Sequence, residues 1–146
     1  MIAEILNRRR VKIIASHCDF PDLDIGAGRF CKARFGLDVQ REFRPDIVAD
    51  AQRLPVKSRS LRGVVSSHLI EHIKSDRALA EMRRVLREGG KAVLFVPDDS
   101  SKLWRLIRPL WGVYYAVAIS RADTPRSHAQ SFNAAKLTAC LREHFD

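Results

Sequence analysis

The sequence predicts an α/β fold, a doubly wound and mostly parallel sheet with helices on both faces. Short apolar runs rich in β-branched residues alternate along the chain with stretches of helical periodicity, which is typical of such sheets. No internal repeat or low-complexity tract interrupts this series. The 146 residues suffice for one domain with a substantial hydrophobic core, so residues 1–146 are expected to form a single domain.

Five apolar runs predict the strands of the sheet. In chain order they cover residues 20–25, 35–39, 46–49, 63–67 and 91–96. The first run breaks at Gly26 and the last ends at Pro97, as expected where a strand gives way to a turn.

Helical periodicity predicts three helices, over residues 2–14, 76–88 and 134–144. Their local signals are the apolar positions Ile2, Ile5, Leu6 and Ile13 in the first helix and Leu79, Met82, Val85 and Leu86 in the second. Gly89 and Gly90 are expected to end the second helix, and Asn133 to cap the third. An apolar stretch over residues 103–119, broken by Pro109, is expected to pack on the sheet or on a partner; the alternative is a lid over the substrate or an interfacial helix.

The formal net charge of +9 is the most informative feature of the composition. It favours an anionic partner such as RNA, DNA or an anionic membrane surface. The alternative is arginine-rich codon usage with the charges spread over a solvated surface. Apart from Arg8, Arg9 and Arg10 the basic residues are dispersed, and no aromatic residues are interleaved to stack bases. Nucleic-acid binding is therefore kept as a second interpretation.

The cysteines and the apolar runs indicate the compartment. Cys18, Cys31 and Cys140 are scattered and form no CxxC pair, so we expect reduced thiols and neither a disulfide framework nor a zinc ribbon. No apolar run reaches the roughly 18 residues of a transmembrane helix, and the N-terminus lacks the pattern of a signal peptide. The sequence therefore predicts a cytoplasmic protein.

A glycine turn and two acids suggest an adenosine site. Gly26 and Gly28 directly follow the first strand, where small residues let the backbone approach a ligand. Phe30 stands about where the dinucleotide fingerprint has its third glycine, which argues against a dehydrogenase. Asp38 and Asp50 follow the next two strands, where carboxylates can accept from ribose hydroxyls and from an adenine amino group. The alternative is that both acids are solvated turn residues.

Five strings follow one another along the chain. They are DLDIGAG (22–28), GLDV (36–39), DIVADAQRLPV (46–56), VVSSHLIEHI (64–73) and ALAEMRRVLREGGKAVLFVP (78–97). In this order and at this spacing they resemble small class I methyltransferases of the methyltransferase-11 type. The resemblance is close over residues 22–97 and looser to residue 146, and it implies a Rossmann-like fold with S-adenosylmethionine as the cofactor.

The resemblance also implies where the cofactor binds. The methionine end would lie against the glycine turn, the ribose hydroxyls on Asp38, and the adenine beside Asp50. The fourth strand would open beneath the methyl donor. The cofactor-binding residues implied in this way are Asp24, Gly26, Ala27, Gly28, Asp38, Asp50, Ala51, Ser66 and Ser67.

Two departures from the family pattern affect the prediction. Only residues 29–34 are available between the glycine turn and the second strand, where the family has a full helix. The family's sheet also continues with two more strands, which this chain lacks, so we expect either a fragment or a minimal version. The fifth strand would then be an exposed edge, which favours pairing with a second copy of the chain.

The string His68-Leu69-Ile70-Glu71-His72 is an HxxEH motif. On a helix, its two histidines would lie one turn apart, as in the zinc site of inverzincin proteases. Its place directly after a buried strand argues against a protease. Some methyltransferases resemble this stretch with an ExxEH that binds a divalent metal, and His128 is a candidate further ligand. We expect that no metal binds and that these side chains pack locally.

The resemblance implies an S-adenosylmethionine-dependent methyltransferase that transfers the methyl group directly to an oxygen, nitrogen or carbon nucleophile. Residues 1–21 would form a leading helix, 22–97 the cofactor-binding core, and 98–146 a lid or substrate-side segment with the final helix. His68, His72 and His128 are the candidates for a catalytic base. Two alternatives stay open, namely an RNA methyltransferase and a non-catalytic methyltransferase-like domain that binds a partner.

Overall fold

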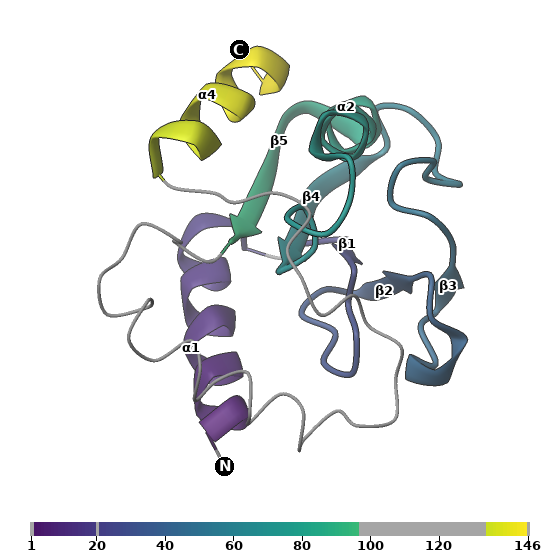
Figure 1. Cartoon of the computed structure of the whole chain (residues 1–146), viewed down its shortest axis with the longest axis vertical. Coiled ribbons are helices and arrows are strands. Elements are labelled where there is room, and N and C mark those ends of the chain that lie inside the picture. Colours follow the sequence, from purple (N-terminus) through teal and green to yellow (C-terminus); the bar gives the residue numbers. More distant parts are fainter. Residues whose placement is uncertain (1, 20, 97–133, 146) are drawn as a thin grey trace.

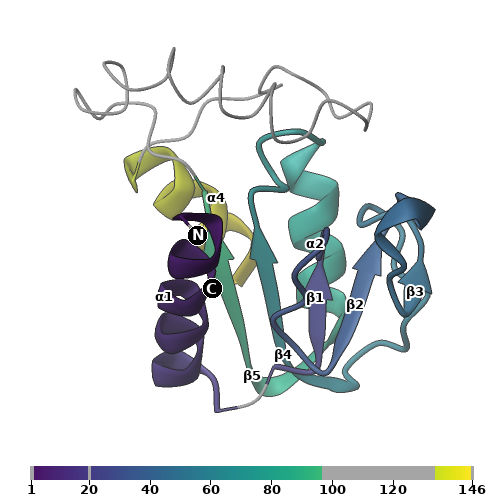
Figure 2. The same ribbon diagram turned by 90° about the horizontal axis from the view of Figure 1, so that it is seen from below.

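The computed structural model describes residues 2–19, 21–96 and 134–145. Five parallel strands form one sheet in the order β3-β2-β1-β4-β5. The strands are β1 (Leu23–Ile25), β2 (Phe35–Asp38), β3 (Ile47–Val48), β4 (Leu61–Ser67) and β5 (Leu86–Phe95). Figure 2 shows their carboxyl ends at one edge of the sheet. The order of winding reverses between β1 and β4, which is where α/β sheets bind ligands.

Helices cover both faces of this sheet, as predicted. Helix α1 (Ile2–His17) lies on one face, and α2 (Ser75–Val85) and α4 (Ala134–Phe145) lie on the other (Figure 1). The predicted doubly wound, Rossmann-like architecture is therefore confirmed. In α1 the buried position is Ile14, and Ile13, which we expected on the apolar face, is 46% exposed. The prediction for residues 103–119 and the expected cap at Asn133 lie outside the described residues.

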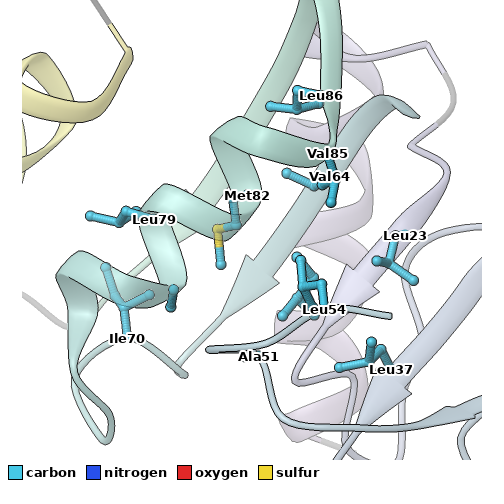
Figure 3. Close-up of a cluster of buried hydrophobic side chains, with 12 residues drawn as sticks. Leu23, Leu37, Ala51, Leu54, Val64, Ile70, Leu79, Met82, Val85 and Leu86 are labelled. Atoms are coloured by element: carbon cyan, nitrogen blue, oxygen red, sulfur yellow. The ribbon is translucent and has the colours of Figure 1, made fainter. Parts of the chain in front are cut away.

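The core lies between the sheet and α2. Ala78, Leu79, Met82 and Val85 recur every three or four residues along α2, and all four are fully buried. Figure 3 shows this helical face packed toward residues of the strands and of the loop after β3. The cluster comprises Leu23, Ile25, Leu37, Ala51, Leu54, Val64, Ile70, Ala78, Leu79, Met82, Val85 and Leu86.

The end of α2 differs from the prediction. The helix stops at Val85, and β5 begins at once with Leu86, which pairs with Leu61. Gly89 and Gly90 therefore do not end the helix but lie within β5, where the register shifts between Leu61 and Gly63. Gly89 has a φ of 70°, and a Cβ at Gly90 would lie 2.8 Å from the Arg87 carbonyl oxygen. The two glycines are needed because the strand bulges there.

The connection between β1 and β2 contains no helix, as its length predicted. Residues 26–34 form turns that backbone hydrogen bonds tie to the neighbouring strands, including those from the amides of Gly26 and Ala27 to the Leu37 carbonyl. The connection between β2 and β3 has only the short 3-10 helix η1 (Arg41–Phe43). The loops at the carboxyl edge of the sheet are thus held by hydrogen bonds and not by helix packing.

Side chains of α2 hold the loop between β3 and β4. The Glu81 carboxylate accepts a hydrogen bond from the Leu54 amide at 2.7 Å, and the Arg84 guanidinium donates to the carbonyls of Leu54 and Val56 at 3.0 and 2.8 Å. Arg84 also pairs with Glu81 at 2.7 Å, and its hydrogen bonds lower the pKa of Glu81. This network fixes the loop that follows Asp50 against the core. Among the described residues, no helix is long and apolar enough to cross a membrane.

Candidate functional site

The glycine turn lies at the carboxyl end of β1. Gly26 and Gly28 both have positive φ angles, of 74° and 56°, which L side chains rarely adopt. A Cβ at Gly26 would lie about 3.0 Å from Leu69, so this glycine makes room for a side chain of the loop after β4. A Cβ at Gly28 would meet nothing within 4 Å. Of the two glycines, Gly28 leaves space for a ligand.

Asp38 ends β2 and is fixed against this turn. Its Oδ2 accepts a hydrogen bond from the Gly28 amide and its Oδ1 from the Gln40 amide, both at 2.9 Å. Since each carboxylate oxygen has about two acceptor positions, one remains on each oxygen. The side chain is 9% exposed. A rigid carboxylate with one open position on each oxygen suits two adjacent hydroxyl groups, such as those of a ribose.

Asp24 lies on β1, below the turn, and is completely buried. Its Oδ2 accepts hydrogen bonds from the amide of Lys32 at 2.8 Å and from the Lys32 ammonium at 3.2 Å. Its Oδ1 has no partner among the described residues. Burial raises the pKa of Asp24, and the charge of Lys32 opposes that effect. Sequence reasoning missed Lys32, because nothing distinguishes it from Arg29 and Arg34 in the same short connection.

Asp50 and Ala51 follow β3, next to Asp38. The Ala49 amide donates to the Asp38 carbonyl at 3.1 Å, which joins the two strand ends. Asp50 is exposed, and its Oδ1 accepts from the Gln52 amide at 2.8 Å. Ala51 is buried in the hydrophobic core. An adenine at this place would therefore meet the Asp50 carboxylate and the backbone of Ala51, because the Ala51 methyl group packs inward.

Ser66 and Ser67 end β4 and have different roles. The Ser66 hydroxyl is buried and donates to the Ile25 carbonyl at 2.9 Å, which joins the carboxyl ends of β4 and β1. Ser67 is 8% exposed, and its hydroxyl has no partner among the described residues. Ser66 therefore stabilises the site, and Ser67 is the serine with a hydrogen bond to offer.

His68 follows β4 directly and has a positive φ of 55°, a conformation rare for side-chain-bearing residues. Its ring lies between two charged groups, with Nδ1 3.2 Å from Oε1 of Glu71 and Nε2 2.6 Å from the Arg10 guanidinium. A guanidinium can only donate, so Nε2 accepts and Nδ1 carries the proton that Glu71 receives. Glu71 is fully buried, and its Oε2 has no partner among the described residues. This is the arrangement of an imidazole oriented by a carboxylate.

The HxxEH string does not form the helix that its zinc geometry requires. Residues 68–74 form a turn, and α2 begins only at Ser75. His68 and His72 are therefore not stacked one helical turn apart. In the part of the chain that the structure describes, no group of three or more His, Cys, Asp or Glu residues could hold a metal ion. His128 lies outside that part, so the absence of a metal stays a prediction.

All three cysteines are free thiols, as predicted. Cys18 is buried, Cys31 is exposed and Cys140 is partly buried. Burial raises the pKa of the Cys31 thiol, so this side chain is not an activated nucleophile.

The arrangement of glycine turn, strand-end acids and following loop agrees with comparisons to known proteins. A family of the methyltransferase-11 type, described as "Methyltransferase domain", matches residues 21–94. The chain belongs to this family. Together with the fold, this membership makes it an S-adenosylmethionine-dependent methyltransferase domain, which confirms the family suggested by the five strings. No curated protein sequence matches it.

Solved structures share the fold. A methyltransferase of Thermotoga maritima, described as a possible histamine N-methyltransferase, superimposes with a TM-score of 0.71 at 19% identity, covering 94% of this chain and 70% of that one. A methyltransferase of Archaeoglobus fulgidus gives 0.69 at 19%, with 97% and 68% covered. A putative methyltransferase of Haloferax volcanii, in complex with the activator Trm112, gives 0.59 at 18%, with 84% and 58% covered. The chain thus spans between 58% and 70% of the length of these structures.

Proposed function

We propose that this chain binds S-adenosylmethionine across the carboxyl ends of β1, β2 and β3 and methylates an oxygen, nitrogen or carbon nucleophile. The observation that carries the proposal is the Asp38 carboxylate, which two backbone amides fix while one acceptor position on each oxygen stays open. The open face of Gly28 and the unpartnered Oδ1 of Asp24 fit the rest of the cofactor. When bound, the cofactor supplies a methyl group activated by its sulfonium.

In this proposal the protein acts mainly by placing the two reactants. Alignment of acceptor and methyl donor supplies most of the acceleration, because the donor is already reactive. Ser67 and His68 follow each other at the end of β4, beside the glycine turn after β1. An acceptor held there would meet the Ser67 hydroxyl and the His68 ring.

An oxygen acceptor must lose a proton, and His68 is the base that the geometry favours. Glu71 holds the proton on Nδ1, so Nε2 is the basic nitrogen. In the structure Nε2 accepts from Arg10, and an acceptor hydroxyl would take the place of that contact. His72 lies in the turn before α2, and no contact of its ring supports the same role.

Calorimetric titration with S-adenosylhomocysteine tests cofactor binding. We expect one site per chain. The absence of binding would contradict the proposal and favour a methyltransferase-like domain that only binds a partner.

The role of His68 is tested with a panel of phenols, amines and RNA, measuring release of S-adenosylhomocysteine. With an oxygen acceptor, His68→Gln should lower kcat by roughly 100- to 10,000-fold without changing the affinity for S-adenosylhomocysteine. His17→Gln, an exposed histidine at the end of α1, is the matched control. An unchanged kcat in His68→Gln would exclude this base.

RNA is a second candidate acceptor because of the net charge of +9. Arg29, Arg41 and Arg44 are exposed in the loops that follow β1 and β2, and Arg29 lies 5.9 Å from the ring centre of Phe43. An RNA acceptor predicts binding that weakens steeply as the salt concentration rises. A weak dependence on salt would favour a small-molecule acceptor.

A cytoplasmic location and assembly with a second copy remain proposals. In the described residues, the outer side of β5 pairs with no strand, which favours edge-to-edge pairing. Sedimentation at several concentrations would show a dimer if that edge is used.

A further inference from the structure

Lys32 has a buried side chain in a connection where the other basic residues, Arg29 and Arg34, are exposed. Its side chain is 5% exposed and that of Asp24, its partner, is 0% exposed. Burying two charges is costly, and an ion pair without further hydrogen bonds rarely offsets that cost. A pair of this kind at the floor of a ligand site therefore requires a reason beyond stability.

The hydrogen bonds of this pair leave one positive and one negative group unsatisfied. The Lys32 ammonium has three donors, of which one goes to Asp24 Oδ2 at 3.2 Å and one to the Phe30 carbonyl at 2.8 Å. Both acceptor positions of Asp24 Oδ2 are taken by Lys32, through its amide and its ammonium. Asp24 Oδ1 is buried and has no partner among the described residues.

The missing helix gives this lysine its importance. In nucleotide-binding folds the helix after the glycine turn presents its N-terminus, with free amides and a partial positive charge, to an anionic ligand. Here residues 26–34 contain no helix. The Lys32 ammonium is then the positive group that the same segment places below the turn.

We propose that the Lys32–Asp24 pair is the receptor for the amino acid end of the cofactor. The third N–H of Lys32 binds the α-carboxylate, and Oδ1 of Asp24 binds the α-ammonium. Because an α-amino acid is a zwitterion with both charges on adjacent atoms, it matches a pair that leaves one donor and one acceptor open. The inference rests on the proposed function and specifies which residue recognises the carboxylate.

Two ligands separate this role from a structural one. S-adenosylhomocysteine carries the amino acid end, whereas 5′-methylthioadenosine has the same adenosine and sulfur without it. Lys32→Met should weaken binding of S-adenosylhomocysteine by about ten- to a hundredfold and change that of 5′-methylthioadenosine less than about twofold. Lys57→Met, which removes an exposed lysine far from the turn, should change neither.

The other results each overturn the inference. Equal weakening of both ligands in Lys32→Met would mean that the lysine only supports the loop. Tighter binding of S-adenosylhomocysteine would mean that it occupies the place of the cofactor's ammonium. If Lys32→Met does not fold, Asp24→Asn, which keeps the shape of the side chain, should show the same selective loss; equal loss would again contradict the proposal. If the unmodified protein binds neither ligand, the proposed function itself fails.

Discussion

Replacing Asp38 by alanine removes the carboxylate that we expect to hold the ribose. The structure shows two hydrogen bonds to this side chain, from the amides of Gly28 and Gln40, and one open acceptor position on each oxygen. If both open positions are used by the ribose, Asp38→Ala leaves two ligand hydroxyls without a partner. This should weaken binding of S-adenosylhomocysteine by roughly 1–3 kcal/mol, or about 5- to 150-fold.

The same substitution also releases the Gly28 amide, so a control must separate loosening of the loop from loss of the ribose contact. Asp46→Ala is suited to this, because the Asp46 carboxylate accepts from the Gly36 amide at 2.7 Å at the other end of β2. It should lower stability by about 1 kcal/mol without changing affinity. Both variants are compared by urea unfolding and by calorimetric titration.

A second ligand makes the test specific. A cofactor analogue without the ribose 2′-hydroxyl should bind the unmodified protein more weakly, but Asp38→Ala should bind both ligands equally. If Asp38→Ala still prefers the ligand with the hydroxyl, or if its affinity is unchanged, the assignment of Asp38 is wrong.

Two further predictions concern stability. Arg84→Met should lower the free energy of unfolding by roughly 1–3 kcal/mol, because it breaks the hydrogen bonds to Glu81, Leu54 and Val56, and urea unfolding measures this. Since Arg84 lowers the pKa of Glu81 in the folded protein, the stabilisation is present above the unfolded pKa of the carboxyl group and is lost as the pH falls through the folded one; a variant whose loss does not shrink with falling pH would refute this. Met82→Ala should cost about 2–5 kcal/mol, because Met82 is fully buried between α2 and the sheet, and a loss below 1 kcal/mol would mean that the core closes around the cavity.

The sheet could be predicted because its signals are local. Short apolar runs, each followed by a turn, marked all five strands, and the glycines after β1 have the positive φ angles that a tight turn requires. Asp38 could be placed because it follows a strand parallel to β1, so that its carboxylate had to lie beside the glycine turn. These inferences need only the sequence and the rule that parallel strands end at one edge.

Other features depend on packing that no local pattern records. Leu86 fits the apolar period of the helix as well as that of a buried strand, so the position of Gly89 and Gly90 suggested a helix end. The structure resolved this in favour of the strand, because Leu86 pairs with Leu61. The contact between Arg10 and His68 joins residues 58 positions apart, and only the placement of α1 brings them together.

Short connections explain why carboxylates are concentrated at this edge of the sheet. Where a helix would bind the amides of a loop internally, the turns after β1 and β2 leave those amides to be satisfied by side chains. Asp38 accepts from Gly28 and Gln40, and Asp24 accepts from Lys32. Each of these carboxylates retains an open acceptor position, so the groups that hold the loops are also the groups left to bind a ligand. Loss of a helix in this fold therefore need not abolish the cofactor site, because the acids that replace its packing supply the polar contacts that a ligand needs.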